Sequence, residues 1–386
     1  MNGWPAQRAG IGGERAGGGP VPVVLVGAGK VAHAAHLREL RDLPDELHLA
    51  AVVEPDPAHI AALHRVGLGA VDRYASVTAA ARAGARAALV CTPWWTHRDV
   101  VLECLAAGLP VLCEKPVTLD PAEIEELAAA ERRTGLPVTA GYMKRHDPVV
   151  RLFLDHCRAR LDRARRLTVD IHDPNAPHQV AHLLPYDPPP FGPQPPPARE
   201  ALARALGPAA SQAQREAYAR GLGGSLIHQV NLVHAVLAGS GRKLAGRLLH
   251  ADGWAQGAGV SCRWRPDDGL LVDMTHQRLP AHRRYREVLE FTASDGVATL
   301  TLPSPYARDE AATLTVQSWD PAGGPAERRV YTAEPGQTGF RRQLLAWARQ
   351  LRGEPGSRGA AGEALPGLAD VRTDTRAVRE AALRLA

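Results

Sequence analysis

Short apolar runs alternate with amphipathic stretches along the first 145 residues of the chain. The apolar runs lie at residues 21–26, 48–53, 87–91, 110–113 and 138–141. Runs of this length are typical of parallel strands that are covered on both faces. Helical periodicity fills the intervals, at residues 30–41, 57–66, 77–83, 96–107 and 121–134. Strands that alternate with helices predict a doubly wound parallel sheet, with its domain at residues 21–146.

After residue 244 the pattern changes to an alternation of apolar and polar residues. It recurs at residues 260–264, 270–275, 288–292, 297–302 and 314–318. Because no helical pattern separates these segments, they predict one large, mostly antiparallel sheet. Amphipathic helices at residues 340–351 and 371–385 close the chain. The predicted fold class is therefore α/β for the first domain and α+β for the second, at residues 147–386.

Two segments fit neither pattern. Residues 1–20 are rich in Gly, Arg and Ala and lack the continuous apolar stretch of a signal peptide, which favours a disordered arm. Residues 173–222 contain a proline-rich stretch at 185–197 and then a helical pattern at 199–220. Long loops are usually functional or disordered. We therefore expect an insertion that covers a pocket or reaches a neighbouring subunit.

The composition excludes several classes of protein. The chain has 386 residues, 45% hydrophobic and 23% charged, as expected for a soluble protein of two domains. No apolar run approaches the roughly 20 residues that cross a bilayer. The net charge of +5 comes from arginines scattered among acidic residues, which does not indicate nucleic-acid binding. Five cysteines without CxxC pairs predict buried thiols in a reducing cytoplasm and no metal site.

A glycine-rich turn, residues 27–32, joins the first predicted strand to the first helix. Gly27 allows a tight turn, and Gly29 lets the backbone approach a pyrophosphate. Lys30 and Val31 open the helix, whose free N–H groups can donate to phosphate oxygens. The context of strand, turn and helix predicts a dinucleotide-binding site.

The second predicted strand ends in an acidic residue, Glu54, followed by Asp56. A carboxylate at this position accepts hydrogen bonds from the adenosine ribose hydroxyls and repels a 2′-phosphate. The sequence therefore favours NAD over NADP. A helix-capping or surface role for Glu54 is the alternative.

Lysine is rare in this chain, with four lysines among the 46 basic residues. A guanidinium stays protonated near neutrality, whereas an ammonium in a dry or cationic pocket can titrate and act as acid or base. Lys115, between Glu114 and Pro116, is the first catalytic candidate on this ground. For Lys243 we accept that it is a surface residue in an arginine-rich composition.

Several strings resemble the glucose-fructose oxidoreductase and inositol dehydrogenase family, also called Gfo/Idh/MocA. They are residues 27–32, 53–56, 91–93 with His97, 114–116, 141–145 and 223–228. The resemblance implies a Rossmann domain followed by a substrate-binding domain. It also implies an NAD(P)-dependent oxidoreductase that forms a homodimer or homotetramer through its C-terminal sheet.

The resemblance implies roles for individual residues. Lys115 is expected beside the nicotinamide and the reacting hydroxyl, and Glu114 is expected to contact ribose. Thr92, Pro93 and His97 are expected to line the nicotinamide end of the cofactor site. In an alcohol oxidation a hydride leaves carbon and a proton leaves oxygen, and a lysine can relay that proton or stabilise the alkoxide.

The second domain departs from the family pattern. Many members carry an aspartate and, one helical turn later, a histidine after the double glycine, but this chain has His228 and Leu232 there. On a helix that begins near Gly224, His228 and Asn231 share a face. We expect His228 as the acid/base partner of Lys115 and Asn231 as a substrate contact. Packing at the domain junction is the alternative for His228, and His234 is expected to be structural.

Four residues near the strand ends are further candidates for the pocket. Strand alternation would send Lys144 and Arg145 to opposite faces, with Lys144 on the face of Tyr142. We expect Lys144 and Tyr142 to contact the substrate and Arg145 to tie the domains together. Trp95, which follows a strand end, is a candidate for stacking on a sugar ring, with core packing as the alternative.

These observations predict an enzyme that oxidises a ring secondary alcohol of a sugar, sugar nucleotide or aminocyclitol, or reduces the matching ketone. The composition suggests a high-G+C source and a role in secondary metabolism, such as aminoglycoside-type biosynthesis, by association only. Two alternatives remain. One is a cofactor-binding sensor without catalysis, because the usual histidine is replaced by Leu232; the other is an imine or biliverdin-type reductase.

Overall fold

The computed structural model describes residues 19–174, 179–186, 193–320, 324, 326–334, 336–354 and 365–385. The predicted N-terminal arm lies almost wholly outside these ranges. So do residues 175–178 and 187–192 of the predicted insertion.

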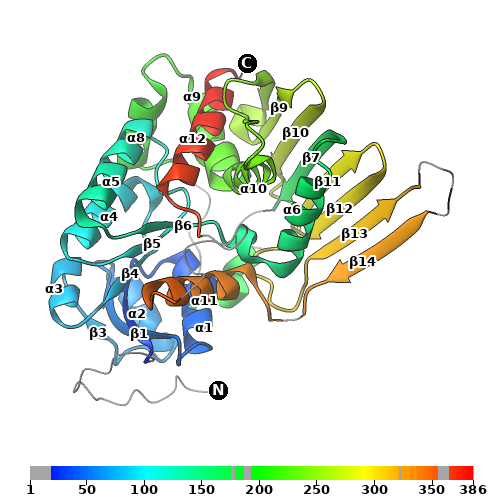
Figure 1. Cartoon of the computed structure of the whole chain (residues 1–386). Helices are drawn as coiled ribbons and strands as arrows, with labels where there is room; N and C mark the ends of the chain where they lie inside the picture. Colours follow the sequence, from blue (N-terminus) through cyan, green and yellow to red (C-terminus); the bar gives the residue numbers. More distant parts are fainter. Residues whose placement is uncertain are drawn as a thin grey trace.

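The first sheet has six parallel strands in the order β3-β2-β1-β4-β5-β6. This order confirms the predicted doubly wound domain (Figure 1). Its strands are β1 (Val21–Val26), β2 (Leu47–Val53), β3 (Asp72–Arg73), β4 (Ala87–Val90), β5 (Val111–Glu114) and β6 (Val138–Gly141). The helices that accompany them are η1 (Ala32–His36), α1 (Leu37–Arg41), α2 (Pro57–Arg65), α3 (Val77–Arg82), η2 (Trp94–Thr96), α4 (His97–Ala106) and α5 (Pro121–Thr134).

Both faces of the first sheet are buried, which explains why its strands are continuously apolar. Val23 and Leu25 of β1 pack in one hydrophobic cluster with α1 and α2. Val24 and Val26, which point the other way, pack with α3, α4 and α5. Alternate residues of one strand therefore serve two separate cores.

Side-chain caps set the starts of three helices. The carboxylates of Asp56, Asp120 and Asp147 accept backbone N–H groups at the first turns of α2, α5 and α6 (Pro148–Ala159), each with proline next in sequence. Gly135 ends α5 in the left-handed conformation, with φ of 69°. These are the expected start and stop residues of helices.

The second sheet has eight strands in the order β14-β13-β12-β11-β7-β10-β9-β8. All neighbouring strands are antiparallel except β7 and β10, which confirms the predicted mostly antiparallel sheet. The strands are β7 (Ala164–Asp173), β8 (Leu248–Trp254), β9 (Gly259–Asp267), β10 (Leu270–Arg278), β11 (Arg286–Ala293), β12 (Gly296–Leu302), β13 (Thr313–Ser318) and β14 (Glu327–Thr332). The pattern analysis did not predict β7, β8 or β14.

The helix predicted at residues 199–220 is broken in the structure. It consists of α8 (Pro196–Leu206), α9 (Gln212–Glu216) and the first part of a π-helical segment, η5 (Ala217–Leu226). Gly207 ends α8 with φ of +88°. The η5 segment runs directly into α10 (Ile227–Leu237), so no helix begins at Gly224.

The double glycine is required for close packing. A side chain on Gly223 would lie 2.5 Å from the Leu119 side chain, and one on Gly224 would lie 2.9 Å from the Ala219 carbonyl oxygen. The expected helix start near Gly224 was therefore wrong, because the glycines lie inside a continuous helical segment.

The last two helices return toward the first domain (Figure 1). Trp347 of α11 (Gly339–Leu351) packs in the same cluster as Leu112 of β5. The other helix, α12 (Leu368–Leu383), lies against α5 and α10. Residues assigned to the second domain by position in the chain thus complete the core of the first. The remaining short helices are η3 (Met143–His146), η4 (Ala181–Leu183) and η6 (Ala255–Gly257).

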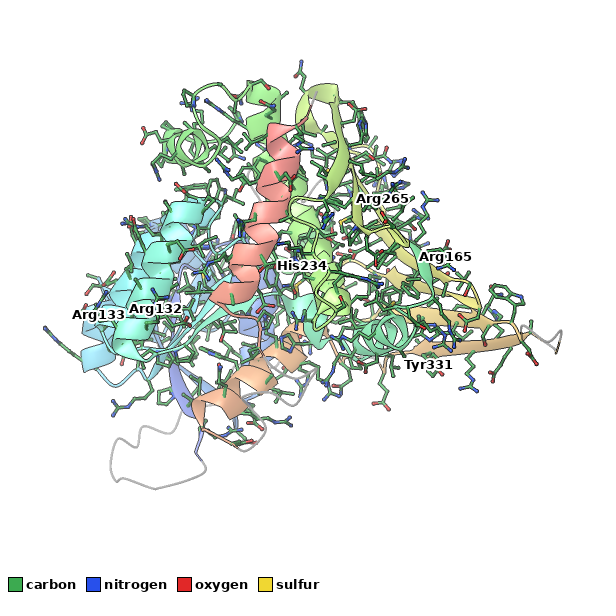
Figure 2. The ribbon with its side chains drawn as sticks, turned by 45° about the horizontal axis from the view of Figure 1, so that its top comes forward. Arg132, Arg133, Arg165, His234, Arg265 and Tyr331 are labelled. Carbon is green, nitrogen blue, oxygen red and sulfur yellow. The ribbon has the colours of Figure 1, made fainter. Side chains whose placement is uncertain are left out.

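All five cysteines are buried and free. No helix within the described ranges is both long and apolar enough to span a bilayer. Arg132 and Arg133 lie at the end of α5, and Arg165 and Arg265 lie on the second sheet, on another side of the molecule (Figure 2).

Candidate active site

The glycine turn at the carboxyl end of β1 has the geometry of a phosphate cradle. Gly27 has φ of +88°, and a side chain there would lie 2.8 Å from the Thr92 backbone nitrogen, so only glycine fits. Above Gly29 the nearest atom to an added side chain is a His59 ring carbon at 3.8 Å. The backbone at Gly29 is thus open to a ligand, and the helix that begins at Lys30 provides unpaired N–H groups. These residues fit the phosphates of a dinucleotide.

Glu54 is held rigidly at the carboxyl end of β2. Its two carboxylate oxygens accept hydrogen bonds from the backbone N–H groups of Ala28, at 2.6 Å, and Asp56, at 2.8 Å. His59 Nδ1 lies 3.3 Å from the same carboxylate. Because each oxygen has a second lone pair, the carboxylate can still accept from ribose hydroxyls.

Glu114 ends β5 and is tied to its neighbours on both oxygens. One oxygen lies 2.8 Å from His36 Nε2, and the other accepts the backbone N–H of Lys115 at 3.2 Å. Burial raises the pKa of Glu114, but the His36 hydrogen bond and the Lys115 charge outweigh it and leave the pKa below its usual value. The carboxylate therefore stays charged beside Lys115, where the Lys115-Pro116 peptide bond is cis.

The Lys115 ammonium lies between the two domains. Its Nζ donates a hydrogen bond to the Gly224 carbonyl oxygen at 2.6 Å. Burial lowers the Lys115 pKa to about 8; the charge of Glu114 opposes this shift, and those of Lys144 and Lys30 add to it. At pH 7 about a tenth of the amine is therefore neutral, far more than in a surface lysine with an ordinary pKa.

His97 fixes the backbone on both sides of the lysine. Its Nδ1 lies 2.8 Å from the Pro116 carbonyl oxygen and its Nε2 lies 2.8 Å from the Thr92 carbonyl oxygen. The two carbonyl oxygens can only accept hydrogen bonds, and a neutral imidazole carries one N–H group. It therefore donates to one of the two oxygens at a time. Burial lowers the His97 pKa. The structure thus places His97 as a brace between the ends of β4 and β5.

The segment after β4 carries Thr92, Pro93 and the two tryptophans. The Thr92 hydroxyl accepts a hydrogen bond from the Thr96 hydroxyl at 2.9 Å, and Pro93 precedes η2. The rings of Trp94 and Trp95 meet edge to face at 5.7 Å, and both are partly buried. Trp95 therefore has a packing partner, and its stacking on a substrate stays a prediction.

His228 is buried near the two cleft lysines. Burial, and then the charges of Lys115 and Lys144, hold its pKa well below 6.5. Its Nδ1 has no hydrogen-bond partner among the described residues, and its ring packs edge to face on Tyr142 at 5.9 Å. The structure thus brings His228 close to Lys115, as expected. Its lowered pKa favours the neutral imidazole at pH 7.

Lys144 is paired within the protein. Its Nζ forms an ion pair with the fully buried Glu287, which also accepts the Tyr285 hydroxyl and, at 2.6 Å, the Gln229 side chain. The strand alternation that assigned Lys144 and Tyr142 to one face does not apply, because β6 ends at Gly141 and Lys144 lies in η3.

Asn231 lies against α12. Its amide donates to Asp374 at 2.7 Å, and His234 Nδ1 lies 2.6 Å from the other oxygen of the same carboxylate. Figure 2 shows His234 on α10 beside α12. Arg145 extends this cluster through its 3.2 Å contact with Asp370. The structure therefore gives Asn231 and His234 a shared role in fixing α10, and Arg145 a role in joining η3 to α12.

Sequence reasoning missed the residues that the second sheet contributes. Asp173, at the end of β7, lies 3.4 Å from His276, and its charge raises the pKa of both Lys115 and Lys30. Tyr306 is close enough to Glu114 and Asp173 for their charges to add to the effect of burial on its pKa. Only a correct prediction of β7 could have indicated that Asp173 ends a strand at the cleft.

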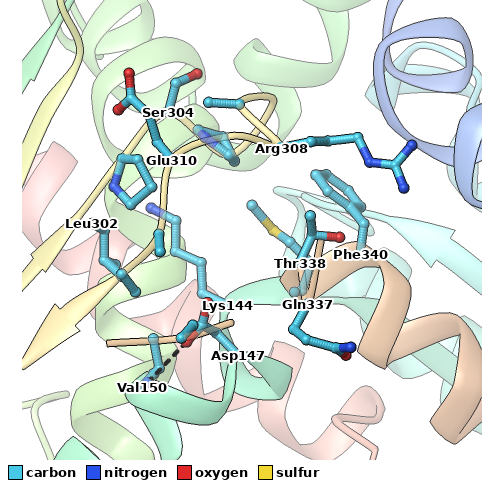
Figure 3. A pocket seen from close by; sticks show the side chains of 18 of the residues that line it. Lys144, Asp147, Val150, Leu302, Ser304, Arg308, Glu310, Gln337, Thr338 and Phe340 are labelled. Atoms are coloured by element: carbon cyan, nitrogen blue, oxygen red, sulfur yellow. Dashed lines mark hydrogen bonds between the residues drawn. The ribbon is translucent and has the colours of Figure 1, made fainter. Parts of the chain in front are cut away.

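Lys144 lines a hollow that encloses about 570 Å³ when the open solvent at its mouth is included. Figure 3 shows Lys144 directed into it, between Leu302 and Thr338, while Arg308 points outward. The Arg308 guanidinium lies 2.7 Å from Asp42 and so ties the loop after β12 to the first domain.

Residues 21–142 match the sequence model of GFO_IDH_MocA, described as an oxidoreductase family with an NAD-binding Rossmann fold. The match places the nucleotide-binding segment, residues 21–142, in the Gfo/Idh/MocA family. Inositol 2-dehydrogenase of Corynebacterium glutamicum strain R is 34% identical over 127 residues, which cover 33% of this chain and 37% of that protein. The corresponding Streptomyces avermitilis enzyme is 38% identical over 128 residues, 32% of this chain and 36% of that protein. The matched segment thus spans little more than a third of these relatives.

Solved structures of this family resemble the whole chain. A 3-ketoreductase from Actinomadura kijaniata in complex with NADP has a TM-score of 0.66 at 17% identity, with 95% of this chain and 98% of that chain covered. A putative myo-inositol dehydrogenase from Sinorhizobium meliloti 1021 has a TM-score of 0.62 at 18% identity, with 93% and 95% covered. At these identities the likeness shows the fold, and it confirms the two-sheet architecture of a Gfo/Idh/MocA protein.

Proposed function

We propose that this Gfo/Idh/MocA protein is an NAD(P)-dependent oxidoreductase. Its substrate is a ring secondary alcohol of a sugar, sugar nucleotide or cyclitol, or the matching ketone. The observation that carries the proposal is the placement of Lys115, a partly buried lysine whose Nζ donates to the Gly224 carbonyl oxygen at 2.6 Å and whose pKa is lowered to about 8. Lys115 follows β5, and the glycine turn follows β1, two strands away in the same parallel sheet. Both therefore lie at the carboxyl ends of the strands.

When bound, the dinucleotide accepts or supplies the hydride. Lys115 provides the proton chemistry: as a neutral amine it takes the hydroxyl proton in oxidation, and as an ammonium it gives a proton to the ketone oxygen in reduction. The Gly224 carbonyl and the His97 contact with Pro116 fix the direction of the Lys115 side chain. Glu114 and Thr92 frame the same end of the site.

His228 acts with Lys115 as a neutral hydrogen-bonding group. Its unpartnered Nδ1 and its burial near Lys115 support this role, since a buried polar nitrogen without a partner is unfavourable. Asp173, which lies near Lys115, provides a carboxylate for a further substrate hydroxyl.

We also propose NAD rather than NADP, because Glu54 presents a fixed carboxylate where a 2′-phosphate would lie. The ring-alcohol substrate class agrees with the inositol 2-dehydrogenases that match the nucleotide domain. A biosynthetic role in secondary metabolism, a cytoplasmic location and a homodimer or homotetramer through the eight-stranded sheet belong to the same proposal.

The test is a binding and turnover assay on the purified chain. Affinities for NADH and NADPH are measured first. Reduction of added NAD or NADP is then followed with inositols, aminocyclitols, sugars and nucleotide sugars as hydride donors. Turnover with a ring alcohol supports the proposal. Tight nucleotide binding with no hydride transfer to or from any of these compounds would favour the sensor alternative.

A further inference from the structure

Part of the insertion crosses from the second sheet to the nucleotide domain. We call residues 179–186 the strap. At its start the Gln179 side chain donates to Asp173 at 2.9 Å and accepts from the Ser304 hydroxyl at 2.9 Å. The strap is thus anchored to the ends of β7 and β12, beside Lys115 and its neighbours.

The other end of the strap lies on the two helices that follow β1 and β2. Arg65, at the end of α2, donates to the Pro185 carbonyl oxygen at 2.8 Å. The Tyr186 ring meets His33 of η1 edge to face at 5.8 Å and lies 5.4 Å from His59 of α2. Tyr186 therefore touches both helices whose first turns border the proposed phosphate and ribose positions. The π-helical form of η1 is itself frequent at functional sites.

The two aromatic rings in this contact each carry a buried polar atom without a hydrogen-bond partner among the described residues. The Tyr186 hydroxyl and His33 Nε2 are both inaccessible and make no hydrogen bond within the described residues. Burial, and then the charges of Glu54 and Asp56, raise the Tyr186 pKa to about 12, so the hydroxyl keeps its proton close to these carboxylates. Buried polar groups are nearly always paired, so each exception needs an explanation, such as strain, a functional role or a bound water, ion or ligand.

We propose that Tyr186 binds the adenosine ribose of the dinucleotide, opposite Glu54. This proposal rests on the proposed function, because it requires a dinucleotide at the glycine turn. A ribose hydroxyl can accept from the Tyr186 hydroxyl and donate to Glu54, which satisfies both groups at once. The second domain thereby contributes a residue to the adenosine half of the cofactor site.

The test compares whole and half cofactors on the full chain. Isothermal titration calorimetry measures the affinity for three ligands. They are the dinucleotide that binds more tightly, either NADH or NADPH, and two fragments of the cofactor, ADP-ribose and nicotinamide mononucleotide. Tyr186→Phe, which keeps the ring, is expected to weaken the dinucleotide and ADP-ribose by about three- to tenfold, the effect of one hydrogen bond. Tyr186→Ala is expected to weaken them by more than about tenfold, because ring contacts are also lost. Nicotinamide mononucleotide should bind unchanged.

Tyr331→Phe on β14 is the matched control and should leave all affinities at the wild-type level. Unchanged ADP-ribose binding in Tyr186→Ala would overturn the assignment of Tyr186. Equal weakening of nicotinamide mononucleotide would overturn it too, since the effect would not be confined to the adenosine half. A wild-type chain that binds neither dinucleotide would instead overturn the proposed function itself.

Discussion

The carboxyl end of the first sheet and helix α10 both bring residues close to Lys115, yet they are fixed in different ways. On the first sheet, partners are mostly nearby backbone groups. Glu54 accepts from the N–H groups of Ala28 and Asp56, and His97 lies between two backbone carbonyls. Such contacts follow directly from the strand-turn-helix geometry, so they recur wherever the motif recurs.

On α10 the partners are side chains from distant parts of the chain. Gln229 donates to Glu287 of β11, and Asn231 donates to Asp374 of α12. His228, on the same helix, lies near Lys115. Burial, and then the charges of Lys115 and Lys144, lower the His228 pKa. The nucleotide half therefore depends mainly on contacts with backbone groups of one fold motif, whereas the α10 side depends on side-chain contacts between distant segments. Five predictions test this difference.

The largest expected effect is that of Lys115→Ala on turnover. Loss of a positioned proton-transfer group should lower kcat by about 10²–10⁴ while nucleotide affinity stays within a few-fold of wild type. Steady-state kinetics and NADH titration measure the two quantities. Lys243→Ala removes an exposed lysine and should leave both unchanged. Near-normal turnover in Lys115→Ala would remove the basis of the proposed function.

The pH profile should follow the Lys115 pKa of about 8. The neutral amine increases as pH rises toward this value, so kcat/KM for oxidation should increase about tenfold per pH unit below it, about a hundredfold over two units, and level off above it. Reduction needs the ammonium and should decrease above pH 8. If the rise in kcat/KM were instead centred near pH 6.5, the titrating group would be a histidine with an ordinary pKa.

His228→Asn tests the contribution of α10 to catalysis. Removal of one positioned hydrogen-bonding group should lower kcat by about 10². Because burial and the two lysines keep His228 neutral, the limb near pH 8 should remain. His234→Asn is the comparison, and it should affect stability more than turnover. Wild-type turnover in His228→Asn would mean that His228 only packs at the junction, with Lys144 as the next group to test.

Asp374→Asn should destabilise the chain. The carboxylate is fully buried and pairs with Asn231 and His234, so an amide leaves at least one buried partner unsatisfied. A loss of about 1–3 kcal/mol in the free energy of unfolding is expected, measured by urea denaturation. The exposed Asp268→Asn serves as the control. An unchanged free energy of unfolding would show that Asp374 does not fix α10.

The smallest effect is expected for Glu54→Gln, which removes the charge but keeps an acceptor. The ratio of NAD to NADP affinity should decrease about tenfold, because repulsion of the 2′-phosphate is lost. Asp56→Asn, the neighbouring carboxylate, should change this ratio less. Tighter binding of NADP than NAD by the wild type would reverse the cofactor assignment.

Much of the first domain could be predicted because local pattern and tertiary environment agree there. Continuous apolar runs predicted β1 and β6 with their observed bounds, and β2, β4 and β5 within one residue at each end. The second sheet was less complete. In β7 the exposed residues Arg165 and Arg166 are adjacent, which interrupts the alternation of apolar and polar residues. The strand that ends at Asp173 was therefore not predicted.

The sequence by itself determined five strands of the first sheet, the glycine turn, Glu54 and Lys115 as candidates, because each depends on residues close together in the chain. Tertiary structure decided the chemistry around them. The Lys115 pKa depends on burial by η5 and on the charges of Lys144 and Asp173, and the neutrality of His228 depends on the same enclosure. Burial and charge proximity are properties of packed neighbours, which no short stretch of sequence contains.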